Sequence, residues 1–282
     1  MDFFWFFVAL SVESSIIPIA DVIVEHRLYL PSVGAFITVV TSLFILQDKL
    51  AHKKMKVDLA IIPSLSLVVI VFAGATYARN TVWQNEFRLW SDVVEKSPFD
   101  ARGRYNLGNA YNHEGRVDKA VEQYEGALKL KPNLAEARNN LGNAYSKKGW
   151  LDKAIEQYEG TLKLKPNLAE ARNDLGNAYS KKGWVDKAIE QYDDALKLKP
   201  DYAEARNNLG SAFNDKGWLD KAIEQYEDAL KVRPDSAIFH YNLGMTFMRS
   251  GLKSKAATEL KAALKLKPDF TGPGRALEYM SK

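Results

Sequence analysis

Small and apolar residues recur along residues 101–270 at a fixed interval of 34 positions. Two sets of residues repeat at this interval, and each set has five members. They are Gly108, Gly142, Gly176, Gly210 and Gly244, and Pro132, Pro166, Pro200, Pro234 and Pro268. Self-similarity of this period indicates a solenoid built from one repeated supersecondary unit. The period divides the segment into five units, namely 101–134, 135–168, 169–202, 203–236 and 237–270.

The apolar positions within one unit predict two helices. In the unit 135–168, Leu141 and Tyr145 fall on one face of a first helix. Gly149 is placed to end this helix, and a second helix follows it. Pro166 then prevents the second helix from continuing into the next unit.

The unit AEARNNLGNAYSKKGWLDKAIEQYEGTLKLKPNL, residues 135–168, resembles the tetratricopeptide repeat. The resemblance implies an all-α fold in which the helix pairs stack into a right-handed α-solenoid. Such stacks need covered ends. Residues 79–100 match only the second half of a unit, because Trp90 lies 34 positions before Tyr124. We expect this degenerate half-repeat to cap one end and a short helix in 271–282 to cap the other.

Two uncharged runs near the start of the chain predict membrane spans. Residues 30–46 and 59–78 contain no formally charged residue over 17 and 20 positions. About 20 apolar residues in a helix are enough to cross the hydrocarbon core of a bilayer. Two buried helices in a soluble core are the alternative interpretation. We expect membrane helices to precede the solenoid, within a membrane region that covers residues 1–78.

The loop between the two runs predicts the orientation of the chain. It contains Lys49, Lys53, Lys54 and Lys56, and short basic loops remain on the cytoplasmic side. The repeats then lie on the exoplasmic side, which is the periplasm if the chain is a bacterial inner-membrane protein. In a eukaryote this side is the lumen of the secretory pathway.

The first 29 residues have a different pattern. Residues 3–12 are apolar but too short to span, and they lack the basic flank of a signal peptide. They resemble the end of a transmembrane helix; a re-entrant or interfacial segment is the alternative. Residues 13–29 then form an exoplasmic loop in which charges gather beside the membrane, and such charges mark a candidate functional site.

The stretch ESSIIPIADVIVEHRLYLP, with the spans and the later ARNTVWQNEFRLWSDVVEKSP, resembles a family of polytopic membrane glycosyltransferases. These GT-C-like enzymes use polyprenyl-linked sugar donors and carry C-terminal tetratricopeptide repeats. The resemblance makes Glu25, His26 and Arg27 weak catalytic candidates, which would hold donor phosphate or order the loop. The acidic catalytic site of the family lies in an early exoplasmic loop that has no counterpart in this sequence. No catalytic residue is therefore identified.

Amide side chains recur on the first helix of each unit, on the side away from its apolar face. Position 6 of the units reads Asn106, Asn140, Asp174, Asn208 and Asn242, and position 9 includes Asn109, Asn143 and Asn177. An amide donates and accepts at once, so a row of amides can hold the backbone of an extended peptide. The phrases NLGNAY and ALKLKPDF also resemble the repeats of O-linked N-acetylglucosamine transferase, whose asparagine ladder holds substrate peptides. Amides that are solvated, or that bridge adjacent units, are the alternative.

Two further repeated features have structural explanations. Trp150, Trp184 and Trp218 each follow a helix-ending glycine, where they either form a contact ridge or pack over the neighbouring turn. The lysines that end each second helix, such as Lys129 and Lys131, suit the negative end of the helix dipole. They are also suited to attract anionic lipid or acidic segments.

Composition narrows the choice of function. The net charge of +4 over 282 residues is too small to suggest a nucleic-acid partner, and the chain contains no cysteine. The sequence contains no phosphate-binding loop, metal-ligand cluster or nucleophile–base motif, so we expect no cofactor or metal. We predict a membrane-anchored scaffold that binds an extended polypeptide. The alternative is the C-terminal part of a membrane glycosyltransferase whose repeats present an acceptor protein. A cytoplasmic assembly adaptor would require the opposite topology.

Overall fold

The computed structural model describes residues 85–281, which fold into helices joined by short turns. The expected partial helix 3–12, the loop 13–29 and the spans 30–46 and 59–78 lie outside the described residues, together with Glu25, His26 and Arg27. Within the part that is described, no helix combines the length and the apolar character that crossing a membrane requires.

Ten of the helices form five pairs, one pair in each 34-residue unit. The first helices of the pairs are α5 (Ala101–His113), α7 (Ala135–Lys147), α9 (Ala169–Lys181), α11 (Ala203–Asp215) and α13 (Ala237–Arg249). The second helices are α6 (Val117–Leu130), α8 (Leu151–Leu164), α10 (Val185–Leu198), α12 (Leu219–Val232) and α14 (Lys253–Leu266). The array of paired helices confirms the all-α repeat fold that the 34-residue period predicts.

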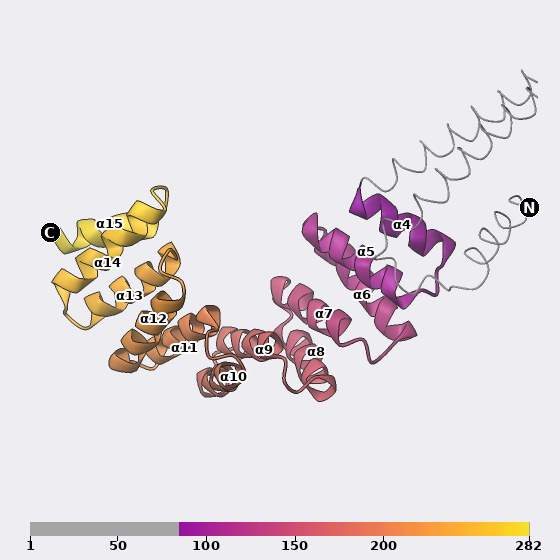
Figure 1. The fold of residues 1–282 in the computed structure, drawn as a ribbon, viewed down its shortest axis with the longest axis horizontal. Helices are drawn as coiled ribbons and strands as arrows, with labels where there is room; N and C mark the ends of the chain where they lie inside the picture. Colours follow the sequence, from indigo (N-terminus) through magenta and orange to yellow (C-terminus); the bar gives the residue numbers. More distant parts are fainter. Residues whose placement is uncertain (1–84, 282) are drawn as a thin grey trace, which may run out of the picture. The chain divides into compact units, whose positions relative to one another are not determined.

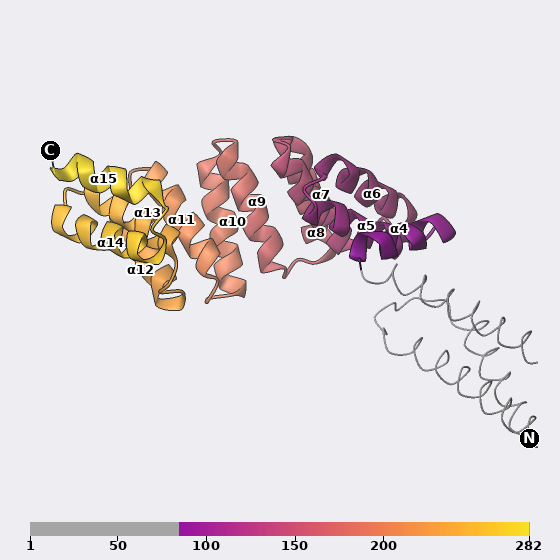
Figure 2. The ribbon, with the colours of Figure 1, turned by 90° about the horizontal axis from the view of Figure 1, so that it is seen from above.

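The pairs follow one another along a curve (Figure 1). The first helices, α5 to α13, lie along its inner side, and the second helices, α6 to α14, lie along its outer side. Each first helix approaches the first helix of the next unit, and each second helix packs against the first helix that follows it. The view from above shows the same succession of pairs (Figure 2). Side chains of successive first helices can therefore meet on the inner side.

A glycine with positive φ ends each first helix. Gly149 has φ of 75°, and the equivalent glycine of every other unit lies between 73° and 78°. The N–H of Trp150 then bonds the carbonyl of Tyr145 at 2.9 Å, and the N–H of Gly149 bonds that of Ser146 at 3.1 Å. This pattern is the Schellman motif, which favours glycine because other residues are strained at this φ.

The two helices of a pair touch where a glycine faces a tyrosine. A Cβ atom added to Gly142 would lie 2.6 Å from Cε1 of Tyr158, and one added to Gly176 would lie 2.5 Å from Cε1 of Tyr192. Both tyrosine side chains are almost fully buried. The core of the array is a continuous row of these aromatic rings and small residues, shared between neighbouring units.

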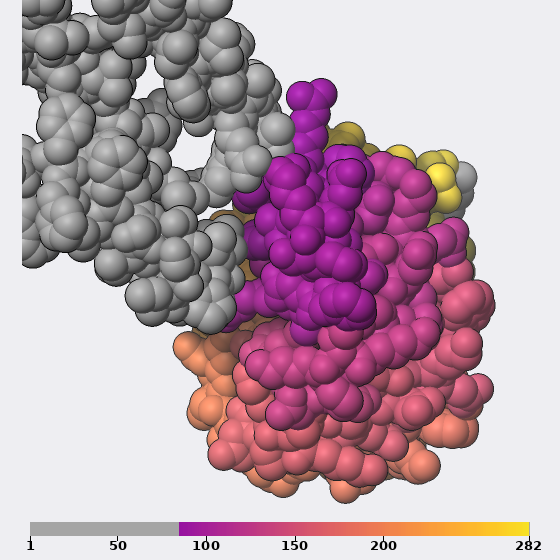
Figure 3. All heavy atoms as spheres, turned by 90° about the vertical axis from the view of Figure 1, so that its right-hand side faces the viewer, coloured from indigo at the N-terminus to yellow at the C-terminus, as the bar shows by residue number. Residues whose placement is uncertain are grey.

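Single helices cover the two ends of the array. At one end α4 (Glu86–Lys96) packs on α5, and the ring centroids of Phe87 and Tyr111 lie 5.1 Å apart. Figure 3 looks along the array from this end, with the atoms of α4 and α5 in front of the later units. At the other end α15 (Thr271–Ser281) packs on α14 and buries Pro273 and Ala276.

Candidate functional site

Side chains at positions 5 and 6 of the first helices connect every unit to the next. Position 5 of one unit meets position 6 of the following unit, so one contact of this kind occurs at each of the four unit boundaries. The donor–acceptor distances are 3.4 Å for Asn140 to Tyr105, 3.4 Å for Asn139 to Asp174, 2.9 Å for Asn208 to Asn173 and 2.9 Å for Asn242 to Asn207. We call these four contacts the interunit ladder. The predicted position-6 residues 140 to 242 thus bridge adjacent units, which was the alternative reading of the asparagine row.

The asparagines at position 9 hold the hydroxyl groups of the buried tyrosines. Oδ1 of Asn109 accepts a hydrogen bond from the Tyr124 hydroxyl at 2.8 Å and a second from Nδ2 of Asn140 at 2.8 Å. Oδ1 of Asn177 accepts equivalent bonds from Tyr192 at 2.8 Å and from Asn208 at 3.0 Å. A buried hydroxyl needs a partner, so position 9 has a structural task within its own unit.

The same task explains how position 9 varies. The Tyr158 hydroxyl donates to Oδ1 of Asn143 at 2.6 Å. Tyr226 interacts with the shorter side chain of Ser211, and burial raises the pKa of Tyr226 to about 12. In the last unit the tyrosine is replaced by Leu260, which has no hydroxyl group, and position 9 is a methionine. An amide is present at position 9 only where a tyrosine hydroxyl faces it.

Some amide groups on the inner helices remain partly or wholly available, namely those of Asn106, Asn109 and Asn177. Asn109 and Asn177 use Oδ1 for the bonds described above, and their Nδ2 groups have no protein partner within residues 85–281. Asn106 belongs to the first unit, so no earlier unit holds it, and its amide makes no bond to another described residue. Free N–H and C=O groups on one face can bond to the backbone of an extended chain.

Asp174 occupies the position that the other units fill with asparagine. Its carboxylate accepts a hydrogen bond from Nδ2 of Asn139 at 3.4 Å, and the amides of Asn143 and Asn173 also interact with it. Burial nevertheless raises the pKa of Asp174 above its usual value, and the repulsion of Glu170 acts in the same direction. Asp174 makes no ion pair with any described residue.

The tryptophans after the helix-ending glycines pack on their own unit. The ring of Trp150 lies 5.7 Å from that of Tyr145 and is 44% exposed. The ammonium groups of Lys148 and Lys153 lie 3.8 Å and 4.9 Å from the centroid of the Trp150 ring. Contacts of the same kind surround Trp184 and Trp218. These rings are engaged in packing and cation–π contacts, so they do not form a bare ridge.

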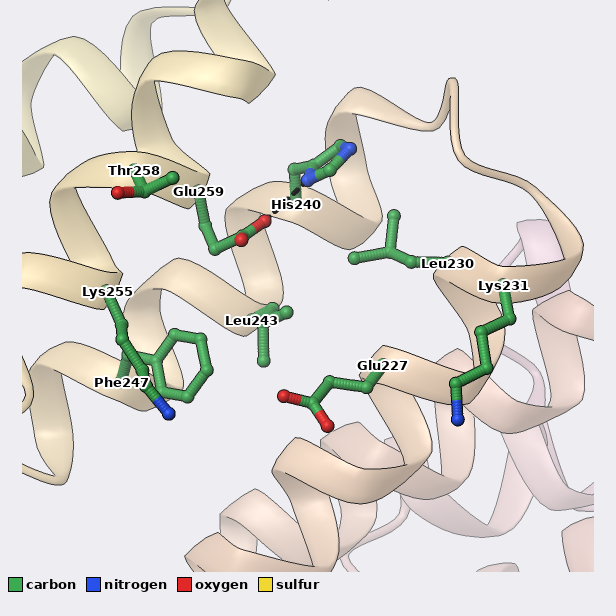
Figure 4. A pocket seen from close by; sticks show the side chains of 9 residues that line it. All are labelled: Glu227, Leu230, Lys231, His240, Leu243, Phe247, Lys255, Thr258 and Glu259. Atoms are coloured by element: carbon green, nitrogen blue, oxygen red, sulfur yellow. Dashed lines mark hydrogen bonds and ion pairs between the residues drawn. The ribbon is translucent and has the colours of Figure 1, made fainter.

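A hollow lies between α12, α13 and α14 (Figure 4). On its wall Nδ1 of His240 lies 2.6 Å from the Glu259 carboxylate, and Nε2 lies 3.0 Å from the carbonyl oxygen of Pro234. The preceding unit has Arg206 at the place of His240, where its guanidinium bonds the carbonyl of Pro200 and the side chain of Gln225. The histidine thus repeats a structural contact of the preceding unit.

The described residues contain no group of three His, Asp or Glu side chains that could hold a metal ion. The residues that the sequence analysis missed are those at position 5, namely Tyr105, Asn139, Asn173, Asn207 and Tyr241. Their recurrence beside position 6 was the available signal.

Comparison with protein families supports the repeat assignment. Residues 108–149, 147–183, 181–217 and 210–251 match a family described as TPR repeat. Residues 237–270 match a second family described as tetratricopeptide repeat. Together these matches cover more than half of the chain.

The chain shares its repeats with longer curated relatives. The chain is 31% identical over 112 residues to protein O-mannosyl-transferase F38B6.6 of Caenorhabditis elegans, a match that covers 39% of this chain and 15% of the relative. It is 32% identical over 115 residues to protein O-mannosyl-transferase TMTC2 of Homo sapiens, with 40% and 13% covered. The matches span about one seventh of each relative's length.

Solved structures share the fold. YrrB, a TPR protein with an unusual peptide-binding site, superimposes with a TM-score of 0.54 at 25% identity, covering 67% of this chain and 97% of that one. MamA superimposes with a TM-score of 0.53 at 30% identity, covering 57% and 95%.

Proposed function

This chain belongs to the tetratricopeptide-repeat family, and from that premise we propose that its array binds an extended polypeptide along the inner helices α5 to α13. The array thereby acts as a protein interaction scaffold. The ligand's backbone is held by the amide groups at positions 6 and 9, so recognition of its main chain is largely independent of sequence.

One observation carries this proposal: the amides of Asn106, Asn109 and Asn177 on the inner helices use only part of their bonding capacity, or none of it, within residues 85–281. Asn109 and Asn177 each accept two hydrogen bonds at Oδ1, one from a tyrosine and one from the next unit's asparagine. These bonds orient the two side chains and leave both Nδ2 donors free. Side chains that are fixed in place lose little rotamer entropy when they bind. Two oriented donors on the inner helices α5 and α9 match an extended ligand that offers carbonyl groups at intervals. The likeness to YrrB supports the same function.

The test uses variants that remove the free Nδ2 donors and keep the hydrogen bonds that Oδ1 accepts. In Asn109→Asp and Asn177→Asp, the retained Oδ1 can still accept from the tyrosine and from the next asparagine, whereas the free Nδ2 becomes an oxygen. A library of random 12-residue peptides displayed on phage is first selected on the purified full chain. The affinity of a selected peptide is then measured by fluorescence anisotropy for the wild type and for the double variant.

We expect the double variant to bind the peptide at least tenfold more weakly, since two hydrogen bonds of about 1 kcal/mol each are lost. Circular dichroism checks that the double variant is folded. The matched control is Glu156→Gln on the outer helix α8, which should bind as the wild type does. Equal affinity of all three proteins, or failure of the library to yield any binder, would contradict the proposal.

A second candidate function is the presentation of acceptor protein to a glycosyltransferase. The observation that favours it is the similarity of the repeats to those of protein O-mannosyl-transferases. Under this proposal the array belongs to a polyprenyl-donor transferase, and Glu25, His26 and Arg27 lie near its donor. An immunoblot of native membranes with an antibody to the repeats tests the idea. A band two or three times larger than 31.8 kDa supports it, and a band near 31.8 kDa favours the scaffold alone.

Membrane anchoring through residues 30–46 and 59–78 is part of both proposals. The basic loop between these runs supports an exoplasmic array, which is periplasmic if the chain resides in a bacterial inner membrane. Because the chain has no cysteine, the variant Ser281→Cys provides a single reactive site. A membrane-impermeant maleimide should label it in intact spheroplasts. Labelling only after lysis would indicate a cytoplasmic adaptor instead.

A further inference from the structure

The contact between Asn139 and Asp174 differs from the other three contacts of the interunit ladder. In those three, position 6 is an asparagine that donates its Nδ2 to an oxygen at position 5. At this boundary the donor and acceptor are exchanged: Nδ2 of Asn139 donates to the Asp174 carboxylate at 3.4 Å. The cause is chemical, because an ionised carboxylate can only accept.

The exchange leaves a polar atom without a partner. Asn139 turns its Nδ2 toward Asp174, so its Oδ1 is buried and receives no hydrogen bond. The equivalent oxygens of Asn173 and Asn207 each accept a bond of 2.9 Å. A buried polar atom without a partner destabilises the protein. An asparagine at position 174 would satisfy Asn139, so the stability of the array does not explain the aspartate.

The Asp174 carboxylate is surrounded by the amide groups of Asn139, Asn143 and Asn173, and no cation among the described residues pairs with it. The negative charge of Glu170 repels it. In addition to burial, the negative charge of Asp174 helps to raise the pKa of three tyrosines that lie on or beside the flanking helices, namely Tyr158, Tyr192 and Tyr202. Asp174 belongs to the inner helix α9 and keeps part of its surface in contact with solvent. A ligand on the inner side can therefore reach it.

We propose that Asp174 and the amides around it form a site for one basic side chain, lysine or arginine, of the bound polypeptide. The site rests on the proposed function, because it adds a charge preference to a surface that otherwise recognises main chain. A half-buried carboxylate without a counter-ion is stabilised by an ammonium or guanidinium group, which donates charged hydrogen bonds. Asp174 is the only acidic residue at position 6 or 9 of the five units, so it gives the ligand a register along the array.

The variant Asp174→Asn tests the site. Asn208, at the next unit boundary, provides a second position at which the carboxylate can be placed. Asn208 faces Asn173 as Asp174 faces Asn139, so the double variant Asp174→Asn, Asn208→Asp moves the carboxylate by one unit. The 12-residue phage library is selected separately on the wild-type full chain and on both variants. We expect the wild-type pool to be enriched in Lys or Arg at one position. Asp174→Asn should lose this enrichment, and the double variant should regain it at a shifted position relative to the other conserved positions of the pool.

A titration gives the size of the effect. One selected peptide and its counterpart with Gln at the basic position are measured against the wild type and Asp174→Asn. The Gln peptide should bind the wild type roughly tenfold to a hundredfold more weakly. Both peptides should bind Asp174→Asn alike, and circular dichroism checks that this variant is folded.

The outcomes separate the two proposals. Peptides selected by every protein without a basic preference would overturn the site at Asp174 and leave the scaffold standing. Failure of all three proteins to select any peptide would overturn both. A basic preference that persists unchanged in Asp174→Asn would also contradict the site, since the charge would then be recognised elsewhere.

Discussion

Asn208 donates its Nδ2 to Oδ1 of Asn173, the side chain that precedes it by 35 residues, at a distance of 2.9 Å. The bond crosses the boundary between the third and fourth units, and the same Nδ2 lies 3.0 Å from Oδ1 of Asn177. One amide group therefore links two residues of the neighbouring unit. Position 6 serves the stacking of the array, and the proposed binding depends on the groups that this stacking leaves free.

The variant Asn208→Ala should destabilise the array, because it removes the donor for two buried or half-buried oxygens. We expect a loss of about 1–2 kcal/mol, seen as a lower melting temperature of the full chain. The matched variant Asn106→Ala should have a negligible effect, since no unit precedes the first. Equal destabilisation by both variants would show that the interunit bond contributes nothing measurable.

The variant Gly142→Ala should also lower stability. Its new Cβ would lie 2.6 Å from Cε1 of the buried Tyr158, so the two helices must separate. Overpacking costs about 1–3 kcal/mol, which exceeds the gain of up to about 1 kcal/mol from replacing glycine in a helix.

The control Gly160→Ala places a methyl group against the end of the flexible Arg138 side chain, 3.1 Å from its Nη1. This variant should retain most of the helix-propensity gain and raise the melting temperature slightly. If both alanines raised the melting temperature, the close approach at Gly142 would not limit helix packing.

Much of this fold follows from the sequence because its determinants are local and repeated. Gly149 needs positive φ to end its helix, and Gly142 needs to be small because Tyr158 lies against it. Each of these requirements leaves the same residue type at 34-residue intervals, or nearly so. A repeat array adds only contacts between nearest neighbours, so one unit predicts the arrangement of all.

The candidate site was less predictable. The sequence placed Asn140 and Asn143 on the inner surface, yet it did not show that Asn143 holds the hydroxyl of Tyr158 or that Asn140 bonds Tyr105. These partners lie in another helix or another unit, and the relevant distances depend on how the units stack. Which oxygen or nitrogen of an amide remains free is decided by those bonds, so it cannot be derived from one helix face alone.

The difference in stability between Asp174→Asn and the wild type should depend on pH, because only the wild type has the titrating carboxyl group. Burial raises the pKa of Asp174 in the folded protein above its unfolded value, so ionisation of this group opposes folding. The resulting destabilisation is complete above the folded pKa and disappears as the pH falls below the unfolded value near 3.8.

We therefore expect Asp174→Asn to be more stable than the wild type at pH 7, by about 1 kcal/mol or more from the restored hydrogen bond and the removed charge. The charge-dependent part of this advantage should shrink as the pH is lowered toward 4. Melting temperatures of both proteins between pH 4 and pH 7 provide the measurement. A difference that grows on acidification would contradict the raised pKa.

The variant Tyr158→Phe should isolate the bond at position 9. It removes the hydroxyl that donates to Asn143 at 2.6 Å and keeps the buried ring. We expect a loss of about 1 kcal/mol, read from the melting temperature. The double variant Tyr158→Phe, Asn143→Met copies the apolar pairing of the last unit and should recover part of this loss. No recovery would show that the two positions are not coupled.

Photo-crosslinking tests the central claim most directly, because it locates a bound peptide on the array. A benzophenone amino acid is placed at Asn106 on the inner helix α5 or at Glu156 on the outer helix α8, and a fluorescent peptide selected on the wild-type full chain is added. The account predicts labelled protein for the variant at position 106 and none for the variant at position 156, with unlabelled peptide competing away the product. Crosslinking at position 156 and not at position 106 would show that the polypeptide binds the outer helices, and the account would be wrong.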